Sequence, residues 1–305
     1  MMRKTLKDLF SNTVIYQYTL PDNNRDIDKT LYSTESDYCY KVSNNDNFVN
    51  LIYNSIIEYS FGSKDINEAQ LQGYILDELI PVALERKMKF SSVAKENTKL
   101  SYGFYGEVIL YILLRVVYGA NALISRGYFF NILENGETKG YDSYHIVSDN
   151  DSLELWFGEA KFYKSYVSAI KSVMKNIQKA LSNDYLKNNV YAILQHSEKL
   201  ENNDTVFSDL LKKIKYNTEV NVIDLINDYN MVLVYPVLIV TNKAAKDYDK
   251  SIEKFIRHIN TKYLKREISI SVKYRVFFVF LPIDNVEKVK RGVLKCIENN
   301  QKLLD

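Results

Sequence analysis

The chain has 305 residues, of which 46% are hydrophobic and 26% are charged, as in an ordinary globular protein. Its 40 Lys and Arg against 38 Asp and Glu leave a net charge of +2, which excludes attraction of nucleic acid by bulk charge. Any basic surface must therefore be local. Two cysteines and three histidines exclude a disulfide framework and a readable Cys/His zinc site.

The amino terminus, MMRKTLKDLF, is charged and lacks the apolar segment of a secretory signal. The longest apolar stretch, residues 108–117, contains Arg115 and is about half the length that a membrane helix needs. We therefore expect a core helix there, and a cytoplasmic protein without a membrane partner.

Residues 1–95 are expected to form an accessory α/β region, because short strand patterns there are followed by helical periodicity. Pro81 interrupts the second helical pattern, and the polar segment KENTKLS that begins at Lys95 predicts the boundary. The predicted elements are strands at 13–20 and 37–42, and helices at 48–59 and 68–80.

From residue 101 onward the pattern predicts an α-β-β-β-α-β core over 101–195. The predicted elements are a helix at 101–118, strands near 126–133, 141–147 and 153–162, a helix at 165–182 and a strand at 190–194. The connections ENGET and SDNDS are short and polar, which is typical of hairpins, so the three consecutive strands should pair antiparallel.

Residues 196–305 are expected to form a C-terminal α/β extension of the same domain. Pro236 marks the strand VLVYPVLIV as an edge or bulged strand, because proline cannot donate to a β-ladder. The other predicted elements are helices at 203–214, 220–229 and 247–262, a strand at 272–281 and a last helix from 284. The fold class that results is mixed α/β, with a central mixed sheet flanked by helices.

The tripeptide Glu159-Ala160-Lys161 ends an apolar run, LELWFGEAKFY, whereas similar tripeptides at 85–87 and 137–139 lie in a charged segment and a predicted turn. Side chains two residues apart on a strand point to the same face. Glu159 and Lys161 should therefore lie side by side. The Ala160 carbonyl between them adds an oxygen of the kind that Mg²⁺ prefers.

Two more carboxylates are expected to join this pair. The hairpin centred near residue 150 places Asp142 opposite residues 158–160. Glu107 is the charge near the start of an otherwise apolar helix, and a buried charge needs a partner. We predict that Asp142, Glu159 and Glu107 bind a metal ion, and that these three and Lys161 are catalytic.

Lysines repeat along one face of the predicted helix that follows Lys161, and they could hold DNA phosphates without reading sequence. The predicted DNA-binding residues are Lys164, Lys171 and Lys175. Structural interpretations stay open for each group: an exposed cross-strand ion pair for Glu159 and Lys161, a turn-capping Asp142, a Glu107 favoured by the helix dipole, and a solvated lysine face.

The order of elements and charged residues resembles the restriction-endonuclease-like PD-(D/E)xK nucleases over about residues 101–195. The segments GFYGEVILYILLR, GYDSYHI and LWFGEAKFY more closely resemble the HamA/AbpA family, nuclease subunits of the bacterial Hachiman anti-phage system. One position departs from the family pattern, because Tyr141 stands where a proline usually precedes the metal-binding aspartate.

This resemblance implies a nuclease domain over residues 96–305 that hydrolyses DNA with Mg²⁺, or alternatively Mn²⁺. It assigns Glu107, Asp142, Glu159 and Lys161 to the active site. It also implies a superfamily 2 helicase subunit, HamB-like, as partner in a bacterial cytoplasm. Two alternatives remain: a catalytically silent subunit that docks a helicase, and a stand-alone restriction-type endonuclease.

Overall fold

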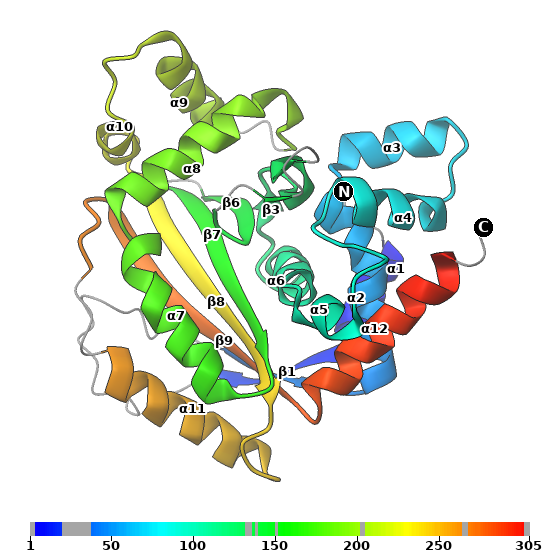
Figure 1. The fold of residues 1–305 in the computed structure, drawn as a ribbon. Helices are drawn as coiled ribbons and strands as arrows, with labels where there is room; N and C mark the ends of the chain where they lie inside the picture. Colours follow the sequence, from blue (N-terminus) through cyan, green and yellow to red (C-terminus); the bar gives the residue numbers. More distant parts are fainter. Residues whose placement is uncertain are drawn as a thin grey trace.

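A mixed sheet runs through the computed structural model, which describes residues 4–19, 38–131, 136–137, 140–149, 152–201, 205–263 and 268–301. Within these residues the sheet has seven strands, in the order β1-β2-β9-β8-β7-β6-β3 (Figure 1). Its strands are β1 (Val14–Thr19), β2 (Tyr38–Val42), β3 (Asn121–Ala122), β6 (Ser143–Asp149), β7 (Ser152–Tyr163), β8 (Val232–Asn242) and β9 (Lys273–Ile283). A separate ribbon pairs β4 (Phe130–Asn131) with β5 (Gly136–Glu137).

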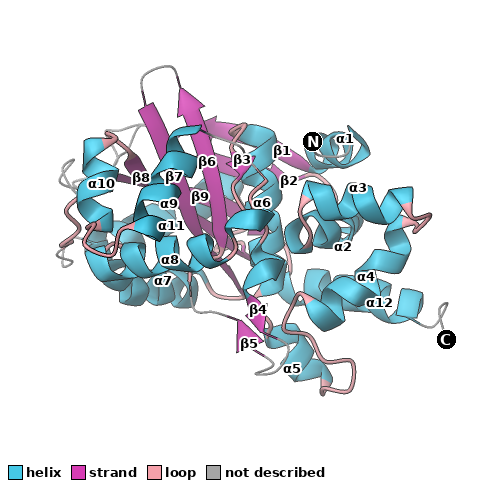
Figure 2. Cartoon of the chain, turned by 90° about the horizontal axis from the view of Figure 1, so that it is seen from above, coloured by secondary structure: helices cyan, strands magenta, loops and turns pink. Residues whose placement is uncertain are grey.

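Helices cover both faces of the sheet, each over its own apolar core (Figures 1 and 2). One face carries α1 (Lys4–Thr13), α2 (Asn45–Ser60), α4 (Leu76–Arg86), α6 (Phe104–Val117) and α12 (Val286–Gln301). The other carries α7 (Tyr166–Ala180), α8 (Asn183–Gln195), α9 (Thr205–Tyr216), α10 (Val222–Asp228) and α11 (Tyr248–Tyr263). The shorter helices α3 (Ser63–Leu71), α5 (Glu96–Ser101), η2 (Arg126–Phe129) and η3 (Ser197–Lys199) connect these elements.

The alternation of side chains along β7 decides which residues meet which helices. Ala160 and Phe162 belong to the core under α6, and a Cβ at Gly106 of α6 would come within 3.3 Å of both. Phe157 belongs to the opposite core, under α7. Because side chains two apart share a face, Glu159 and Lys161 lie on the α7 side.

The mixed α/β class is confirmed, and the predicted hairpin of β6 and β7 is present with antiparallel pairing. The predicted strand at 190–194 is wrong, because these residues lie inside α8. Leu186, Val190 and Ile193 are buried there at helical spacing, which a short apolar run does not reveal. The strand that follows α7 in the sheet is β8. The last strand of the predicted α-β-β-β-α-β core therefore begins about forty residues later in the chain than expected, after α8, α9 and α10.

Three local predictions are also wrong. The expected strand at 126–133 is replaced by η2 and the two-residue β4. The helix expected at 68–80 is divided into α3 and α4 by a turn in which Gly73 has a φ of +90°. Pro81 lies inside α4 instead of ending a helix.

Pro236 does not mark an edge, because β8 pairs in parallel with both β7 and β9. The β7–β8 register is the same at Trp156↔Val234 and at Glu159↔Val237, so Pro236 causes no bulge, but the pairing is interrupted between them, where Gly158 lies beside Pro236. This interruption accommodates a residue that has no N–H to donate. It lies directly before Glu159.

The N-terminal region shares the sheet and core of the rest of the chain. β2 pairs in parallel with β9, and α2 packs against α6 and α12. By length and composition alone, residues Glu96–Val117 are long and apolar enough to cross a membrane, but 56% of their apolar stretch is buried inside the protein. The core helix of a folded domain has the same length and composition, and α6 packs between α2 and the sheet.

We expect Gly158→Ala to lower the free energy of unfolding by about 1–3 kcal/mol, as overpacking does in other cores. A Cβ at Gly158 would lie 2.9 Å from both the Cγ and the carbonyl oxygen of Pro236, and 3.0 Å from Leu110. Urea denaturation measures the loss. Ser148→Ala, at an exposed position of the same hairpin, is the control and should leave stability unchanged within about 0.5 kcal/mol. Equal stability of the two variants would contradict this account of the β7–β8 contact.

Candidate active site

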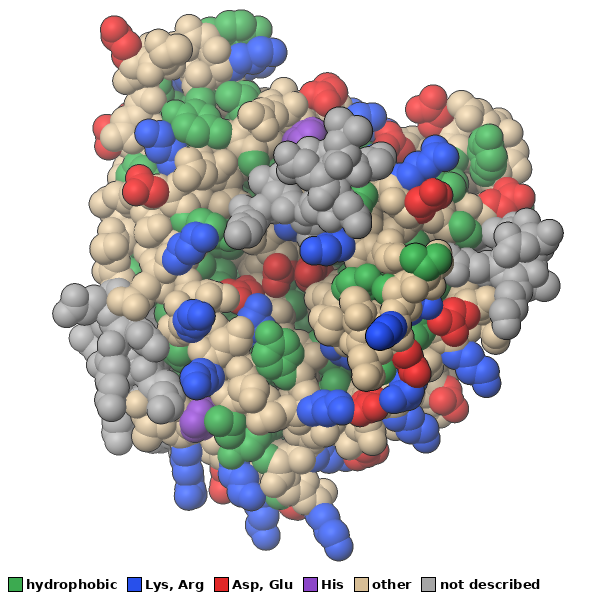
Figure 3. All heavy atoms as spheres, in the orientation of Figure 1, with side chains coloured by type: hydrophobic (Ala, Val, Ile, Leu, Met, Phe, Trp, Pro, Cys, Tyr) green, Lys and Arg blue, Asp and Glu red, His purple; other side chains and the backbone are tan. Residues whose placement is uncertain are grey.

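A polar cavity of about 330 Å³ lies on the α7 side of β7, beside the start of β6. Its walls combine carboxylates, cations and tyrosines from the segment before β6 and from β7, β8, η2, α7 and α8. The lining residues are Arg126, Gly140, Tyr141, Asp142, Gly158, Glu159, Lys161, Asn176, Lys179, Ala180, Tyr185 and Tyr235. The face drawn in Figure 3 has a hollow near its centre in which acidic and basic side chains lie together.

Asp142 connects the start of β6 to the middle of β7. Its backbone N–H donates to the Gly158 carbonyl at 2.8 Å, and its carboxylate Oδ2 accepts the Ala160 N–H at 2.8 Å. The register pairs Ser143 with Gly158, so the predicted placement of Asp142 opposite residues 158–160 is confirmed. Asp142 thus extends the hydrogen bonding between β6 and β7 to the residue before the start of β6.

The Glu159 carboxylate is held from three sides. Its Oε1 forms an ion pair with the Lys161 ammonium and accepts the Asn176 Nδ2–H at 3.4 Å, and its Oε2 accepts the Tyr235 hydroxyl. The side chains of Lys161 and Glu159 are only 14% and 11% exposed. They are therefore not the exposed surface ion pair of the structural interpretation, and their charges act on each other in a medium that screens them less than water.

Burial raises the pKa of Asp142 to about 6, the nearby Glu159 adds to the rise, and Lys161 and the Ala160 amide oppose it. Burial alone would lower the pKa of Lys161, but Asp142 and Glu159 together hold it above its usual value. Lys161 consequently stays protonated at neutral pH. It can offset negative charge and orient a water molecule, but it cannot act as a general base.

The donor set fits a hard cation. Asp142 and Glu159 supply carboxylate oxygens to the same cavity. The N–H and C=O of one strand residue point towards the same neighbour, so the Ala160 carbonyl lies on the Asp142 side, as its N–H does. Oxygen ligands of this kind suit Mg²⁺.

Glu107 is not brought into this group. Its Oε2 accepts the hydroxyl of Tyr59 from α2, and it does not line the cavity. No three Asp, Glu, His or Cys side chains meet as a metal-binding group anywhere in the described part of the chain. Glu107 lies apart from Glu159 because its helix, α6, packs on the opposite face of β7, the face that carries Ala160. The predicted three-carboxylate site is thus reduced to Asp142 and Glu159.

The three predicted DNA-binding lysines lie outside the cavity wall. Lys164 forms an ion pair with Glu287 of α12. Lys171 and Lys175 are exposed on α7. Lys179, one turn further along the same helix, does line the cavity and lies 5.2 Å from the centre of the Tyr185 ring.

Several polar residues of the site were not predicted from the sequence, among them Arg126, Asn176, Tyr185 and Tyr235. Arg126 is 6% exposed and comes from η2, where a strand was expected. Asn176 lies three residues before Lys179 on α7, so helical spacing could have found it. Tyr235 comes from β8, and no local pattern connects it with Glu159. Its position depends on the pairing of β7 with β8.

Without a metal ion the contribution of Asp142 to the stability of the protein should fall as pH rises from 3.8 to 6. The pKa of Asp142 is higher in the folded chain than in the unfolded chain, so folding favours its neutral form, and this contribution is lost as pH rises through the folded pKa. The full effect is at most about 3 kcal/mol. Urea denaturation in EDTA measures it. Asp142→Asn keeps an oxygen for the Ala160 N–H and should flatten the profile in this range. An unchanged slope would show that Asp142 has no raised pKa.

Comparison with known proteins agrees with the resemblance of the three sequence segments. The family model of HamA matches residues 7–297, which include most of α1, the cavity and most of α12. No curated protein and no solved structure shows significant similarity to the chain. The chain therefore belongs to the HamA family, and with it to the components of Hachiman antiviral defence.

Proposed function

We propose that this chain is a Mg²⁺-dependent DNA nuclease and the effector subunit of a defence complex. The observation that carries the proposal is the meeting of Asp142, Glu159 and Lys161 in one cavity, joined by the bond from the Ala160 N–H to Asp142. Two carboxylates and a protonated lysine are the groups that metal-dependent hydrolysis of a phosphodiester needs.

Asp142, Glu159 and the Ala160 carbonyl would hold the metal ion, with Mn²⁺ as a possible substitute for Mg²⁺. When bound, the ion would polarise the phosphodiester and offset the charge of its transition state. Lys161 donates to the attacking water and stabilises negative charge that develops on the phosphate oxygens. Its ammonium is pre-positioned by Glu159, so little reorganisation is needed when the substrate binds.

Tyr235 and Asn176 act on Glu159 instead of on the substrate. Tyr235 is buried, and its hydroxyl fixes Oε2, while Asn176 donates to Oε1. A carboxylate that is fixed in this way keeps its orientation when Lys161 turns towards a water molecule or a phosphate. These two residues are therefore positioning residues in the proposed reaction.

The DNA is proposed to approach along the exposed face of α7. Lys175 and Lys171 lie on this face about one and about two turns before Lys179, which lines the cavity. Cations in such an array attract phosphates independently of sequence. Lys164 is engaged by Glu287, so its contribution to DNA binding would require that ion pair to open.

The partner is proposed to be a superfamily 2 helicase, as the HamA family implies. Two alternatives predict different behaviour. A catalytically silent subunit would bind the helicase without cutting DNA, and a stand-alone restriction-type endonuclease would cut at specific sequences without a partner. The presence of both Asp142 and Glu159 in one cavity supports the enzymatic function over the silent one, because Glu159 adds to the rise in the pKa of Asp142 and a bound cation would relieve this repulsion.

We expect Lys161→Ala to reduce Mg²⁺-dependent plasmid cleavage at least about a hundredfold, in line with the loss of an electrostatic group in other enzymes. Agarose gels of plasmid incubated with the purified variant measure the rate. Lys89 is exposed and does not line the cavity, so the Lys89→Ala variant should cleave plasmid at the rate of the unaltered protein. EDTA should abolish cleavage by both active proteins. Undiminished activity of Lys161→Ala would refute the assignment.

Co-purification with the superfamily 2 helicase that the family implies tests the partnership. We expect plasmid cleavage by the chain to change when the helicase is present, since the partner would deliver or release the DNA. Binding without any cleavage by either preparation would favour the silent subunit. Cleavage at a defined sequence by the chain alone would favour the restriction-type enzyme.

A further inference from the structure

A second cavity, of about 550 Å³, lies at the carboxyl end of β7 and holds none of the residues of the proposed active site. It is lined by cations, hydroxyl groups and the ends of helices from three parts of the chain. The lining residues are Asn97, Leu100, Ser101, Phe162, Tyr163, Lys164, Ser165, Ser168, Val286, Glu287 and Lys290.

The topology of the sheet creates this crevice. β7 and β9 are both parallel to β8, so their carboxyl ends lie at the same edge, and each is followed by a helix. α7 then packs on one face of the sheet and α12 on the other (Figure 1). Between two helices that diverge in this way, open α/β sheets bind their ligands. Both helix amino termini, with their positive dipole ends, border the cavity.

Lys290 is a buried cation in the wall of this cavity. The residue is only 9% exposed, and its ammonium donates to the Leu100 carbonyl at 3.0 Å. The rings of Tyr105 and Phe162 lie 5.0 and 5.4 Å from it. Burial, and then the nearby Lys164, lower its pKa to about 8, so the ammonium is mostly charged at neutral pH.

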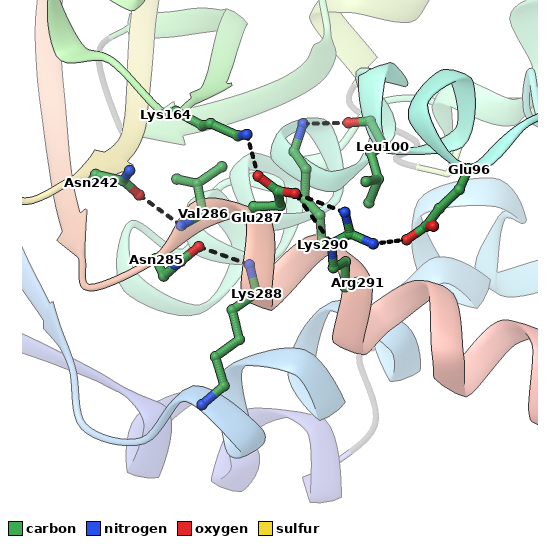
Figure 4. A network of polar contacts seen from close by, with 10 residues as sticks. All are labelled: Glu96, Leu100, Lys164, Asn242, Asn285, Val286, Glu287, Lys288, Lys290 and Arg291. Carbon is green, nitrogen blue, oxygen red and sulfur yellow. Dashed lines mark hydrogen bonds and ion pairs between the residues drawn. The ribbon is translucent and has the colours of Figure 1, made fainter.

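The acidic groups around Lys290 are engaged by other cations (Figure 4). Glu287 pairs with Lys164 and with Arg291, and Arg291 also pairs with Glu96. Within the described part of the chain Lys290 forms no ion pair, and two of its three N–H donors have no described acceptor. A buried charge without a counter-ion is costly, and a bound anion would supply the missing acceptors.

The amides and hydroxyls of the cavity favour a tetrahedral oxyanion. The Ser165 side chain caps α7 by accepting the Ser168 N–H at 3.4 Å, and both serines line the cavity. The first amides of α12 are already bonded to Asn242 and Asn285 (Figure 4). Amides of α7, serine hydroxyls and the ammonium of Lys290 are the donors that phosphate groups take in proteins.

We propose that this cavity is a phosphate-binding site distinct from the proposed catalytic cavity, with Lys290, Ser165 and Ser168 as its ligands. Two sources can supply the group: a backbone phosphate of a nucleic acid strand, or the phosphate of a free nucleotide, for which the volume leaves room. The proposal concerns binding alone and stands whether or not the chain cleaves DNA.

Binding measurements on the full chain in EDTA test this site, because no cleavage occurs there without metal. The probes are inorganic phosphate, a deoxynucleoside monophosphate and a single-stranded oligonucleotide without terminal phosphates, titrated at constant ionic strength. We expect Lys290→Met to weaken binding of the probe that uses the site about tenfold, the value of one charge-assisted hydrogen bond. Ser168→Ala, which leaves the buried lysine in place, should weaken it about threefold.

Lys288→Met is the matched control, since Lys288 is exposed on the same helix and its side chain points away from Lys290 in Figure 4. It should bind every probe as the unaltered protein does. Weakened binding of the monophosphate identifies a nucleotide as the source, and weakened binding of the oligonucleotide alone identifies a strand phosphate. If Lys290→Met and Ser168→Ala both bind all three probes like the control, the proposal is overturned and Lys290 serves only to cap α5.

Discussion

The hydrogen bond from the Ala160 N–H to the Asp142 carboxylate is the contact on which the rest of the site depends. β6 begins at Ser143, and the residue before it is tied to β7 twice: the Asp142 N–H bonds the Gly158 carbonyl, and its carboxylate reaches two residues further, to the Ala160 N–H. The bond brings a carboxylate from the preceding loop beside Glu159 and Lys161. The Ala160 carbonyl points to the same side of β7 as the Ala160 N–H, and so it also lies on the Asp142 side.

The alternation of side chains along β7 then places its packing residues and its candidate site residues on opposite faces of the sheet. Ala160 and Phe162 pack under α6 and hold the helix to the sheet, whereas Glu159 and Lys161 face α7. The same rule explains why Glu107, although its helix packs against the same strand, does not join the carboxylates. A helix on one face of a sheet can supply polar groups to the other face only around an end of the sheet.

The carboxylates are costly to bury, and the surrounding residues offset this cost with specific partners. Tyr235, Asn176 and Lys161 all bond Glu159, and Lys161 with the Ala160 amide limits the rise in the pKa of Asp142. Such a set of buried acids and bases is typical of functional sites. The second cavity lies at the end of the same strand, and among the residues that the structure describes its charged groups are paired except Lys290.

Local pattern was enough to predict the β6–β7 hairpin, the pairing of Asp142 with residues 158–160, and the shared face of Glu159 and Lys161. These features depend on side-chain periodicity and turn chemistry within about twenty residues. The position of Tyr235, the place of β8 at the centre of the sheet and the exclusion of Glu107 depend on contacts between distant segments. Pro236 and residues 190–194 have local signals that packing overrides, because Gly158 accommodates the proline and the core accepts Val190 and Ile193 at helical spacing.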